Sequence, residues 1–232
     1  MFFKIIEIFV CSLTNMKHWR PIESNPEVLT EFARQLGLKD SLNFHDILAF
    51  EDWALEMIPQ PVAGVLFLYK LNESEQLNEI DNPSMTPPFF LPQTVENACG
   101  TVALIHLLAH LIDNSVDGQV DPSGWVGRFM KDCVNDSYNA RAIKFENNIE
   151  IETLHRGAER QGQSAEEEEE VDTHFICFVE KDRKVWELDG IKSAPKCWGP
   201  CEDFLKKVVD VVKKEFIDKN PGELRFALQA LA

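Results

Sequence analysis

Positive charge is scarce in this chain. Its 232 residues carry 23 Lys and Arg against 39 Asp and Glu, which gives a formal net charge of −16. Proteins that bind the phosphate backbone of nucleic acids depend on Lys and Arg, so this balance argues against a nucleic-acid partner. It favours a neutral or basic partner instead, because opposite charges attract across an interface.

Cysteine is too sparse for a disulfide framework. The six cysteines are spread over the whole length, whereas disulfide-rich secreted domains are short and dense in cysteine. A reducing compartment fits better, and we expect the cytoplasm, with the nucleus also open. Cys197 and Cys201 lie four residues apart without a second ligand pair. A structural zinc site needs four ligands, so the sequence predicts no metal.

No hydrophobic run reaches the length of a membrane span. Residues 1–15 read MFFKIIEIFVCSLTN and, like a signal peptide, carry a Lys near the start. Glu7 interrupts this run, no small-x-small cleavage site follows, and the run is too short for a bilayer. Met16 can itself start a chain. We therefore interpret residues 1–15 as a dispensable extension or gene-model artefact, and expect neither secretion nor a membrane partner.

The length and the hydrophobic content of 44% fit one globular domain, which is α/β or α+β. Residues 25–37 predict a helix with Asn25 as N-cap and Gly37 as its stop. The continuous apolar run 61–71 predicts a buried strand. We also expect a helix in 121–133 capped by Ser123 or Asp121, a helix in 201–220, strands over 174–179 and 184–189, and a loop over 155–172.

A cysteine stands where a polar segment turns into an apolar helix. The segment QTVENACGTVALIHLLAHLI covers residues 93–112, and Asn97 is the expected N-cap, which places Cys99 in the first turn. Unpaired N–H groups and the positive end of the helix dipole favour a thiolate there. Gly100 lets a substrate backbone approach the sulfur. The alternative is a small, inert core residue.

A predicted hairpin brings a histidine and an aspartate together. If residues 174–189 form a hairpin whose two-residue turn is Lys181 and Asp182, His174 lies directly opposite Asp189. Their Cβ atoms are then about 5 Å apart on one sheet face. That spacing suits an imidazole–carboxylate hydrogen bond, as in triads of nucleophile, base and orienting group. The alternative is an ordinary cross-strand ion pair at a sheet edge.

Three further residues bear on the chemistry near Cys99. His106 and His110 lie seven and eleven residues later on the same expected helix, which puts them roughly 10 Å or more along its axis. They lack the glutamate of a zinc-protease motif, so we predict packing roles rather than metal binding. Gln93 lies six residues before Cys99, and its amide can donate to an oxygen that develops negative charge.

Taken together, these segments resemble the papain-like ubiquitin carboxyl-terminal hydrolases of the short, single-domain type. The resemblance runs roughly from Trp19 to Ala232. The segments that carry it read W-x-P-I-E-S-N-P-E-V from residue 19, LPQTVENACGTVALIHLLAH from residue 91, THFICFVEKDRKVWELDGIKSAP from residue 173, and NPGELRFALQALA from residue 220.

The resemblance implies a reaction and four roles. It makes Cys99 the nucleophile, His174 the general base and acid, Asp189 the group that orients His174, and Gln93 the oxyanion donor. An amide or ester at the C-terminus of ubiquitin is attacked, a thioester acyl-enzyme forms, and water releases ubiquitin. No metal or organic cofactor is needed.

The resemblance also implies a fold and a domain organisation. The fold is that of papain-like cysteine proteases, a central, mostly antiparallel sheet flanked by helices, with a knotted backbone that is a rare exception among proteins. Residues 16–232 form the catalytic domain, and residues 155–172 form a loop that crosses over the active site. We expect the protein to act as a monomer.

Ubiquitin contacts are implied in three segments. Substrate tails thread beneath the crossover loop, which favours small or unfolded leaving groups. The excess of acidic residues suits a substrate tail that bears arginines. The run Glu166–Glu170 either adds to this negative electrostatic field or forms an ordinary solvated loop. The implied contact residues are Pro21, Ile22, Glu23, Ser24, Asn25, Pro26, Glu152, Leu154, His155, Glu159, Pro221, Glu223, Leu224, Arg225 and Phe226.

Two other functions stay open at this point. One is a ubiquitin-binding protein of the same fold with negligible turnover. The other is a hydrolase of a related modifier such as NEDD8. The presence of all four chemical residues favours the hydrolase of ubiquitin.

Overall fold

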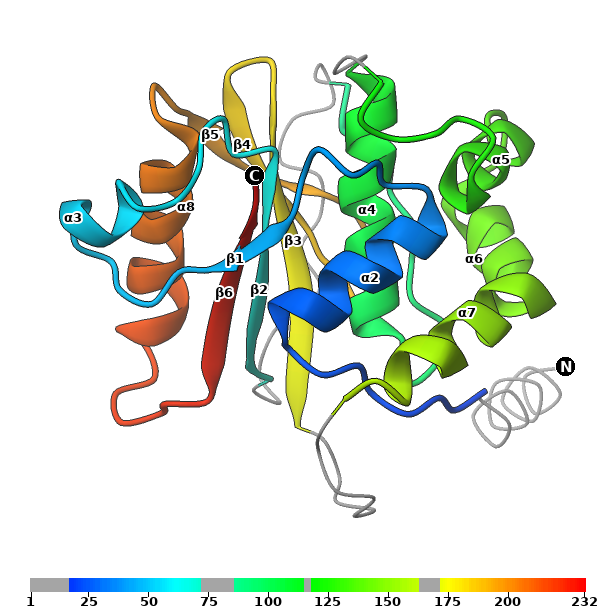
Figure 1. Ribbon diagram of the computed structural model, residues 1–232, viewed down its shortest axis with the longest axis horizontal. Helices are drawn as coiled ribbons and strands as arrows, with labels where there is room; N and C mark the ends of the chain where they lie inside the picture. The colour runs from blue at the N-terminus through cyan, green and yellow to red at the C-terminus, as the bar shows by residue number, and fades with distance from the viewer. Residues whose placement is uncertain (1–16, 72–85, 115–117, 163–171) are drawn as a thin grey trace, which may run out of the picture.

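A six-stranded antiparallel sheet forms the centre of the protein (Figure 1). The computed structural model describes residues 17–71, 86–114, 118–162 and 172–232. The strand order is β1-β6-β2-β3-β4-β5. The mixed fold predicted from the sequence is thereby confirmed, whereas the knotted backbone stays a prediction. The strands are β1 (Phe44–Asp46), β2 (Gly64–Lys70), β3 (Thr173–Lys181), β4 (Lys184–Leu188), β5 (Lys196–Pro200) and β6 (Phe226–Leu231).

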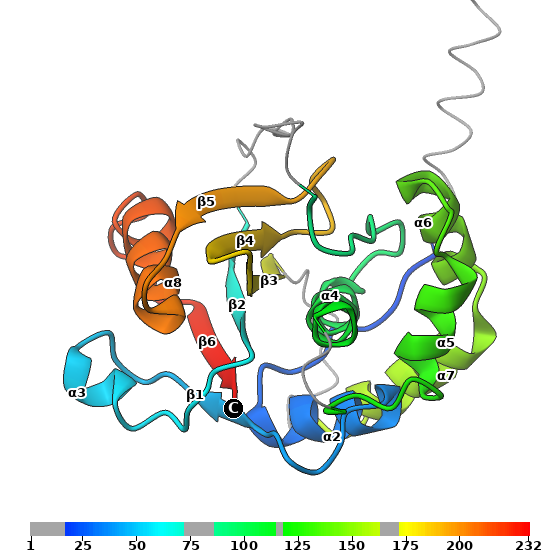
Figure 2. The ribbon, with the colours of Figure 1, turned by 90° about the horizontal axis from the view of Figure 1, so that it is seen from above.

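Helix α4 (Cys99–Asp113) runs through the interior on one side of the sheet. Every residue from Cys99 to Leu111 is buried, as expected for a helix that is apolar on nearly all sides. Figure 2 shows it end-on between the sheet and the outer helices. In the described part of the chain, no helix is long and apolar enough to cross a membrane. The outer helices are α2 (Pro26–Leu36), α5 (Trp125–Asp132), α6 (Tyr138–Glu146) and α7 (Ile149–Glu159).

Helix α8 (Phe204–Val212) covers the opposite face of the sheet and continues as a π-helical turn, η1 (Lys213–Ile217). The short helix α3 (Asp52–Leu55) lies on the same side. Strand β2 therefore has an apolar core on each face: Leu66 points to the α4 side, and Phe67 points to the α8 side. This explains why the predicted strand is a continuous apolar run rather than an alternating one.

The ends of α2 follow the sequence prediction. The side chain of Asn25 accepts hydrogen bonds from the N–H groups of Glu27 at 2.8 Å and Val28 at 3.3 Å. Gly37 ends the helix with a φ of 125°, a conformation that favours glycine. An N-cap of this kind contributes about 1 kcal/mol.

Two predicted N-caps are wrong. Asn97 does not cap α4: it has a φ of 59°, and its amide donates to the Trp19 carbonyl at 3.0 Å. The residue at the cap position is Ala98, which has no side-chain acceptor. In α5, the cap position belongs to Gly124 rather than to Ser123 or Asp121. A Cβ on Gly124 would lie 2.8 Å from the Cα of Gly37, so the packing of the chain, rather than capping preference, selects glycine.

The predicted hairpin register is also wrong, by two residues. The turn consists of Asp182 and Arg183, both with positive φ of 54° and 56°, and Lys181 pairs with Lys184. A two-residue turn of this type needs positive φ at both central positions, which aspartate tolerates well at the first. Because side chains alternate with a period of two, the shift leaves His174 and Asp189 on the same face.

The predicted loop over residues 155–172 begins too early. Residues 149–159 form α7, whose buried face carries Ile151, His155 and Ala158. These three positions are spaced as on one face of a helix. Because His155 is polar, the sequence does not show a regular apolar pattern there. The run Glu166–Glu170 lies outside the described residues, and so does most of the expected crossover loop.

Candidate active site

The sulfur of Cys99 lies at the N-terminus of α4. Cys99 is the first helical residue and is 8% exposed. Its thiol is hydrogen-bonded to the His174 side chain and to the backbone of Phe175 and Gly100. Burial raises the pKa of the thiol, but the hydrogen bond and positive charge of His174 outweigh burial, so the pKa of Cys99 is lowered.

The ring of His174 connects the thiol to a buried carboxylate. Its Nε2 lies 2.7 Å from Oδ1 of Asp189, and both side chains are almost fully buried. Since a carboxylate only accepts hydrogen bonds, Nε2 carries a proton, and the other ring nitrogen is left for Cys99. Burial lowers the pKa of His174, but Asp189 and Cys99 together hold it above its usual value. The two shifts together favour a thiolate beside an imidazolium.

Gln93 contacts Gly190, the residue that follows Asp189. Its backbone N–H donates to the carbonyl of Gly190 at 2.8 Å, and its Nε2 donates to the carbonyl of Val95 at 3.1 Å. Its Oε1 is buried and accepts no hydrogen bond from the described residues. An amide has two N–H donors, so one remains for an oxygen of a substrate.

Glycine is required where these elements meet. A Cβ on Gly190 would lie 2.9 Å from both Cβ of Gln93 and Cγ1 of Val102, one turn after Cys99. Gly190 thus allows the end of β4, helix α4 and the Gln93 segment to converge. Gly100 also has a packing role, since a Cβ there would lie 3.3 Å from the Phe175 ring and 3.4 Å from Ile22. The approach of a substrate backbone at Gly100 stays a prediction.

The chemical reactivity of Cys99 provides a first prediction. We expect iodoacetamide to alkylate it with a pH midpoint below that of an ordinary thiol, and without any substrate, because the His174 hydrogen bond is present in the structure. In His174→Ala only burial and the backbone contacts remain, so the midpoint should move upward. Burial raises the pKa of Cys133 to about 11, which makes it an internal unreactive control. An unchanged midpoint in His174→Ala would contradict the ion pair.

His106 serves as a buried hydrogen-bond acceptor. Its Nε2 accepts the N–H of Leu91 at 3.0 Å, and its ring stacks on Phe90 with centroids 5.2 Å apart. It thus fixes the segment that leads to Gln93. Over the described ranges, no group of three or more His, Cys, Asp or Glu could hold a metal ion. We interpret His106 as a positioning element of the core.

His155 has an internal role that the sequence did not reveal. Its Nδ1 lies 2.7 Å from Oγ1 of Thr101, and its Nε2 lies 2.7 Å from the carbonyl of Arg20. The ring packs against Trp19 at a centroid distance of 4.3 Å, with the two planes tilted by 39°. It therefore joins α7, α4 and the N-terminal segment. Because His155 is wholly buried, its side chain is not on the surface as a ubiquitin contact would require.

Three buried histidines predict acid sensitivity. Burial lowers the pKa values of His106, His110 and His155 to about 4, from a usual 6.5. The unfolded chain therefore binds protons between these values while the folded chain does not. The stabilisation that comes from keeping these three histidines neutral is therefore present above pH 6.5. As the pH drops towards 4, the free energy of unfolding falls by up to about 4 kcal/mol per pH unit for three protons.

Urea unfolding between pH 7 and pH 5 measures this loss. His106→Gln keeps an acceptor for the Leu91 N–H but cannot bind a proton, so its slope should be shallower by about 1.4 kcal/mol per pH unit. Its overall stability should also be lower, because the stacked ring is lost. A free energy of unfolding that stays constant over this range would refute the assignment of three neutral histidines.

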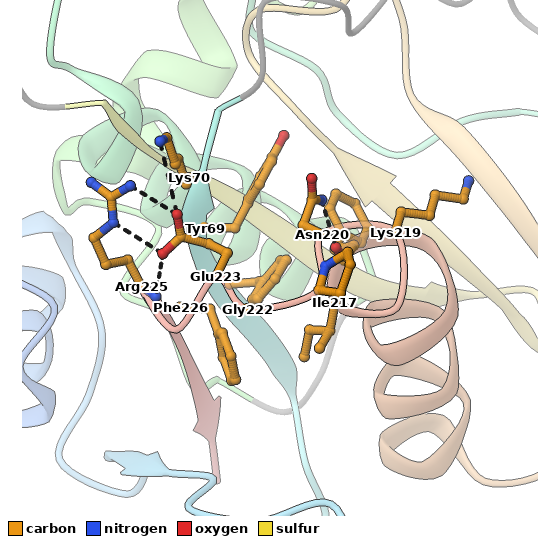
Figure 3. Close-up of a pocket in the computed structure, with 12 residues that line it drawn as sticks. Tyr69, Lys70, Ile217, Lys219, Asn220, Gly222, Glu223, Arg225 and Phe226 are labelled. Carbon is orange, nitrogen blue, oxygen red and sulfur yellow. Dashed lines mark hydrogen bonds and ion pairs between the residues drawn. The ribbon is translucent and has the colours of Figure 1, made fainter.

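The segments expected to contact ubiquitin lie partly inside and partly on the surface. Ile22 is buried and Asn25 caps α2, whereas Leu224 is 82% exposed. Glu223 and Arg225 form a bidentate pair, and these hydrogen bonds lower the pKa of Glu223 to about 2. Figure 3 shows this pair at the rim of a pocket of about 430 Å³ between β2 and η1.

Sequence comparisons show which known proteins this chain is similar to. Residues 19–218 match the model of the family described as ubiquitin carboxyl-terminal hydrolase, family 1. The chain is 34% identical over 229 residues to ubiquitin carboxyl-terminal hydrolase 3 of Arabidopsis thaliana, covering 94% of this chain and 96% of that one. It is 32% identical to the human isozyme L1 over 222 residues, covering 91% and 97%.

The fold is also similar to a solved structure. The catalytic domain of Trichinella spiralis UCH37, crystallised with ubiquitin vinyl methyl ester, matches with a TM-score of 0.77 and 24% identity. The match covers 94% of this chain and 98% of that one. The likeness shows that the two chains share a fold.

Proposed function

The chain belongs to the ubiquitin carboxyl-terminal hydrolase family 1, and from this premise we propose that it releases ubiquitin from adducts at the C-terminal carboxyl group. The observation that carries the proposal is the arrangement of three side chains. The Cys99 thiol is hydrogen-bonded to His174, which is hydrogen-bonded to the buried Asp189. This is the nucleophile, base and orienting group of a thiol hydrolase.

The first half of the reaction forms a thioester. The Cys99 thiolate attacks the carbonyl carbon of the amide or ester, and a C–S bond forms while the oxygen gains negative charge. The free amide N–H of Gln93 and the N–H of Cys99 at the helix start stabilise that charge. The imidazolium of His174 gives its proton to the leaving amine or alcohol, and the bond to the leaving group breaks.

The second half restores the enzyme. Neutral His174 takes a proton from water, and the resulting hydroxide attacks the thioester carbon. The C–S bond breaks, ubiquitin leaves with a free carboxyl group, and Cys99 returns as a thiolate beside the imidazolium. Asp189 stabilises the charged ring at the beginning and end of this cycle.

Ubiquitin is proposed to bind across three surface segments, which are residues 21–26, 152–159 and 221–226. The exposure of Leu224 and Arg225 and the net charge of −16 support this, since an acidic protein attracts a tail that bears arginines. We leave Ile22 and His155 out because the side chains of both are buried. Residues 16–232 are proposed as the catalytic domain, acting as a monomer in the cytoplasm or nucleus, with residues 1–15 as an extension.

Hydrolysis of a fluorogenic amide at the C-terminus of ubiquitin tests this function. We expect turnover, and faster turnover with a small leaving group than with a folded protein in its place. Binding of ubiquitin without turnover would identify a binding protein instead. Competition between ubiquitin and NEDD8 for the same reaction decides which modifier is the substrate, and we expect ubiquitin to win.

A further inference from the structure

Three charged side chains are buried together behind the catalytic pair. Lys192 is 8% exposed, and Glu187 and Asp189 are 1% exposed. Nζ of Lys192 lies 2.5 Å from Oε1 of Glu187 and 3.6 Å from Oδ2 of Asp189. On the far side, the indole N–H of Trp198 donates to Oε2 of Glu187 at 2.8 Å. Lys192 therefore lies between two buried carboxylates.

Stability alone is a poor reason for this arrangement. Removing a charge from water costs several kcal/mol, and apolar residues of similar size often stabilise a core equally well. Moreover, Glu187 already balances the charge of Lys192, so this pair would be neutral without involving Asp189. The proximity of Lys192 to Asp189 points to a role in the reaction.

The two oxygens of Asp189 are in different surroundings. Oδ1 accepts hydrogen bonds from Nε2 of His174 at 2.7 Å and from the N–H of Ile191 at 3.1 Å. Oδ2 is buried and accepts no hydrogen bond from the described residues, but it faces the ammonium of Lys192. A carboxylate this deep would otherwise tend to take up a proton, and Oδ2 is where that proton would sit.

We propose that Lys192 is a positioning residue of the active site, whose ammonium group keeps the Asp189 carboxylate charged and turned towards His174. Glu187 and Trp198 hold the ammonium in place. The inference rests on the proposed function, because it assigns Lys192 to the same hydrolysis. Lys192 acts through Asp189 and His174 and is buried behind them, so its loss should affect the rate of reaction more than the binding of ubiquitin.

Several charged groups determine the pH dependence at Asp189. Burial raises its pKa, but His174 of β3 and the charge of Lys192 outweigh burial and lower it. Glu187 of β4 opposes this with a negative charge, and His106 of α4 is neutral at the pH values of interest, since its pKa is about 4. Removal of the Lys192 charge therefore raises the pKa of Asp189. The acidic limb of kcat/KM should then move to higher pH.

Three variants separate this role from a structural one. Lys192→Met alone leaves Glu187 as an unpaired buried charge and endangers folding, so the decisive variant is Lys192→Met with Glu187→Gln, which removes both charges. We expect it to fold, with kcat reduced by about 10- to 100-fold and KM little changed. Its acidic limb should shift upward, by less than loss of the Lys192 charge alone would produce, because the opposing charge of Glu187 is lost with it. Glu187→Gln alone keeps the Lys192 charge and removes the negative charge that opposes it, so its acidic limb should not move to higher pH. Lys192→Arg keeps the positive charge and should largely keep the wild-type rate.

A second measurement distinguishes failure of this inference from failure of the proposed function. Alkylation of Cys99 by iodoacetamide needs no ubiquitin, and its pH midpoint should also rise in the double variant. A wild-type protein without turnover would contradict the proposed function, and the alkylation midpoint would still decide the role of Lys192. A folded double variant with the wild-type kcat, pH profile and alkylation midpoint would show that Lys192 is only structural.

Discussion

Replacement of Cys99 by alanine is expected to reduce turnover of a ubiquitin C-terminal amide by about 10⁴-fold or more. The side chain removed is the only group in the proposed mechanism that forms a covalent bond with the substrate. Affinity for ubiquitin should stay within a few-fold of the wild type, because Cys99 is buried and the proposed contact segments lie elsewhere. Steady-state kinetics measure the first effect, and calorimetric titration with ubiquitin measures the second.

A matched control for this variant is available in the same core. Cys133 is as deeply buried but lies at the end of α5, so Cys133→Ala should keep full turnover. If Cys99→Ala retained substantial activity, or if Cys133→Ala lost it, the assignment of the nucleophile would be wrong.

Replacement of Asp189 by asparagine is expected to lower kcat by up to about 10⁴-fold. The amide can still accept a hydrogen bond from His174, so the fold should remain, but it no longer stabilises the imidazolium. Asp189 raises the pKa of His174, so this pKa should fall in the variant. The basic limb of its pH profile should therefore move to lower pH. The pH profile of kcat/KM and urea unfolding together measure both effects.

Asp210 supplies the control for this change. It is an exposed aspartate on α8 that pairs with Lys214, and Asp210→Asn should leave rate and pH profile unchanged. A fully active Asp189→Asn would remove Asp189 from its orienting role, and with it the basis for the role of Lys192.

The position of Cys99 could be predicted because its signal is local. A polar segment followed by a long apolar run indicates the start of a helix. The unpaired N–H groups at a helix N-terminus favour a thiolate, which makes a cysteine at this position a candidate nucleophile. The meeting of His174 and Asp189 could also be predicted, although the hairpin register was wrong by two residues. Alternation along strands makes such an error harmless for the question of which face a side chain occupies.

The remaining parts of the site depend on tertiary structure. Nothing in the local sequence shows that Lys192 reaches Glu187 and Asp189, or that His155 joins α7 to Thr101. The one available signal was the spacing of Glu187 and Asp189, which are two apart and therefore share a sheet face. The sequence does not show which polar side chains are buried. A buried polar residue on the inner face of a helix, such as His155, has the same appearance in the sequence as an exposed residue in a loop.

The most direct test of the account uses ubiquitin whose C-terminus carries a vinyl methyl ester, followed by peptide mapping of the modified thiol. We predict a single covalent adduct on Cys99, formed by the wild type and by Cys133→Ala but not by Cys99→Ala. An adduct on any other cysteine, or no adduct with correctly folded wild-type protein, would contradict it.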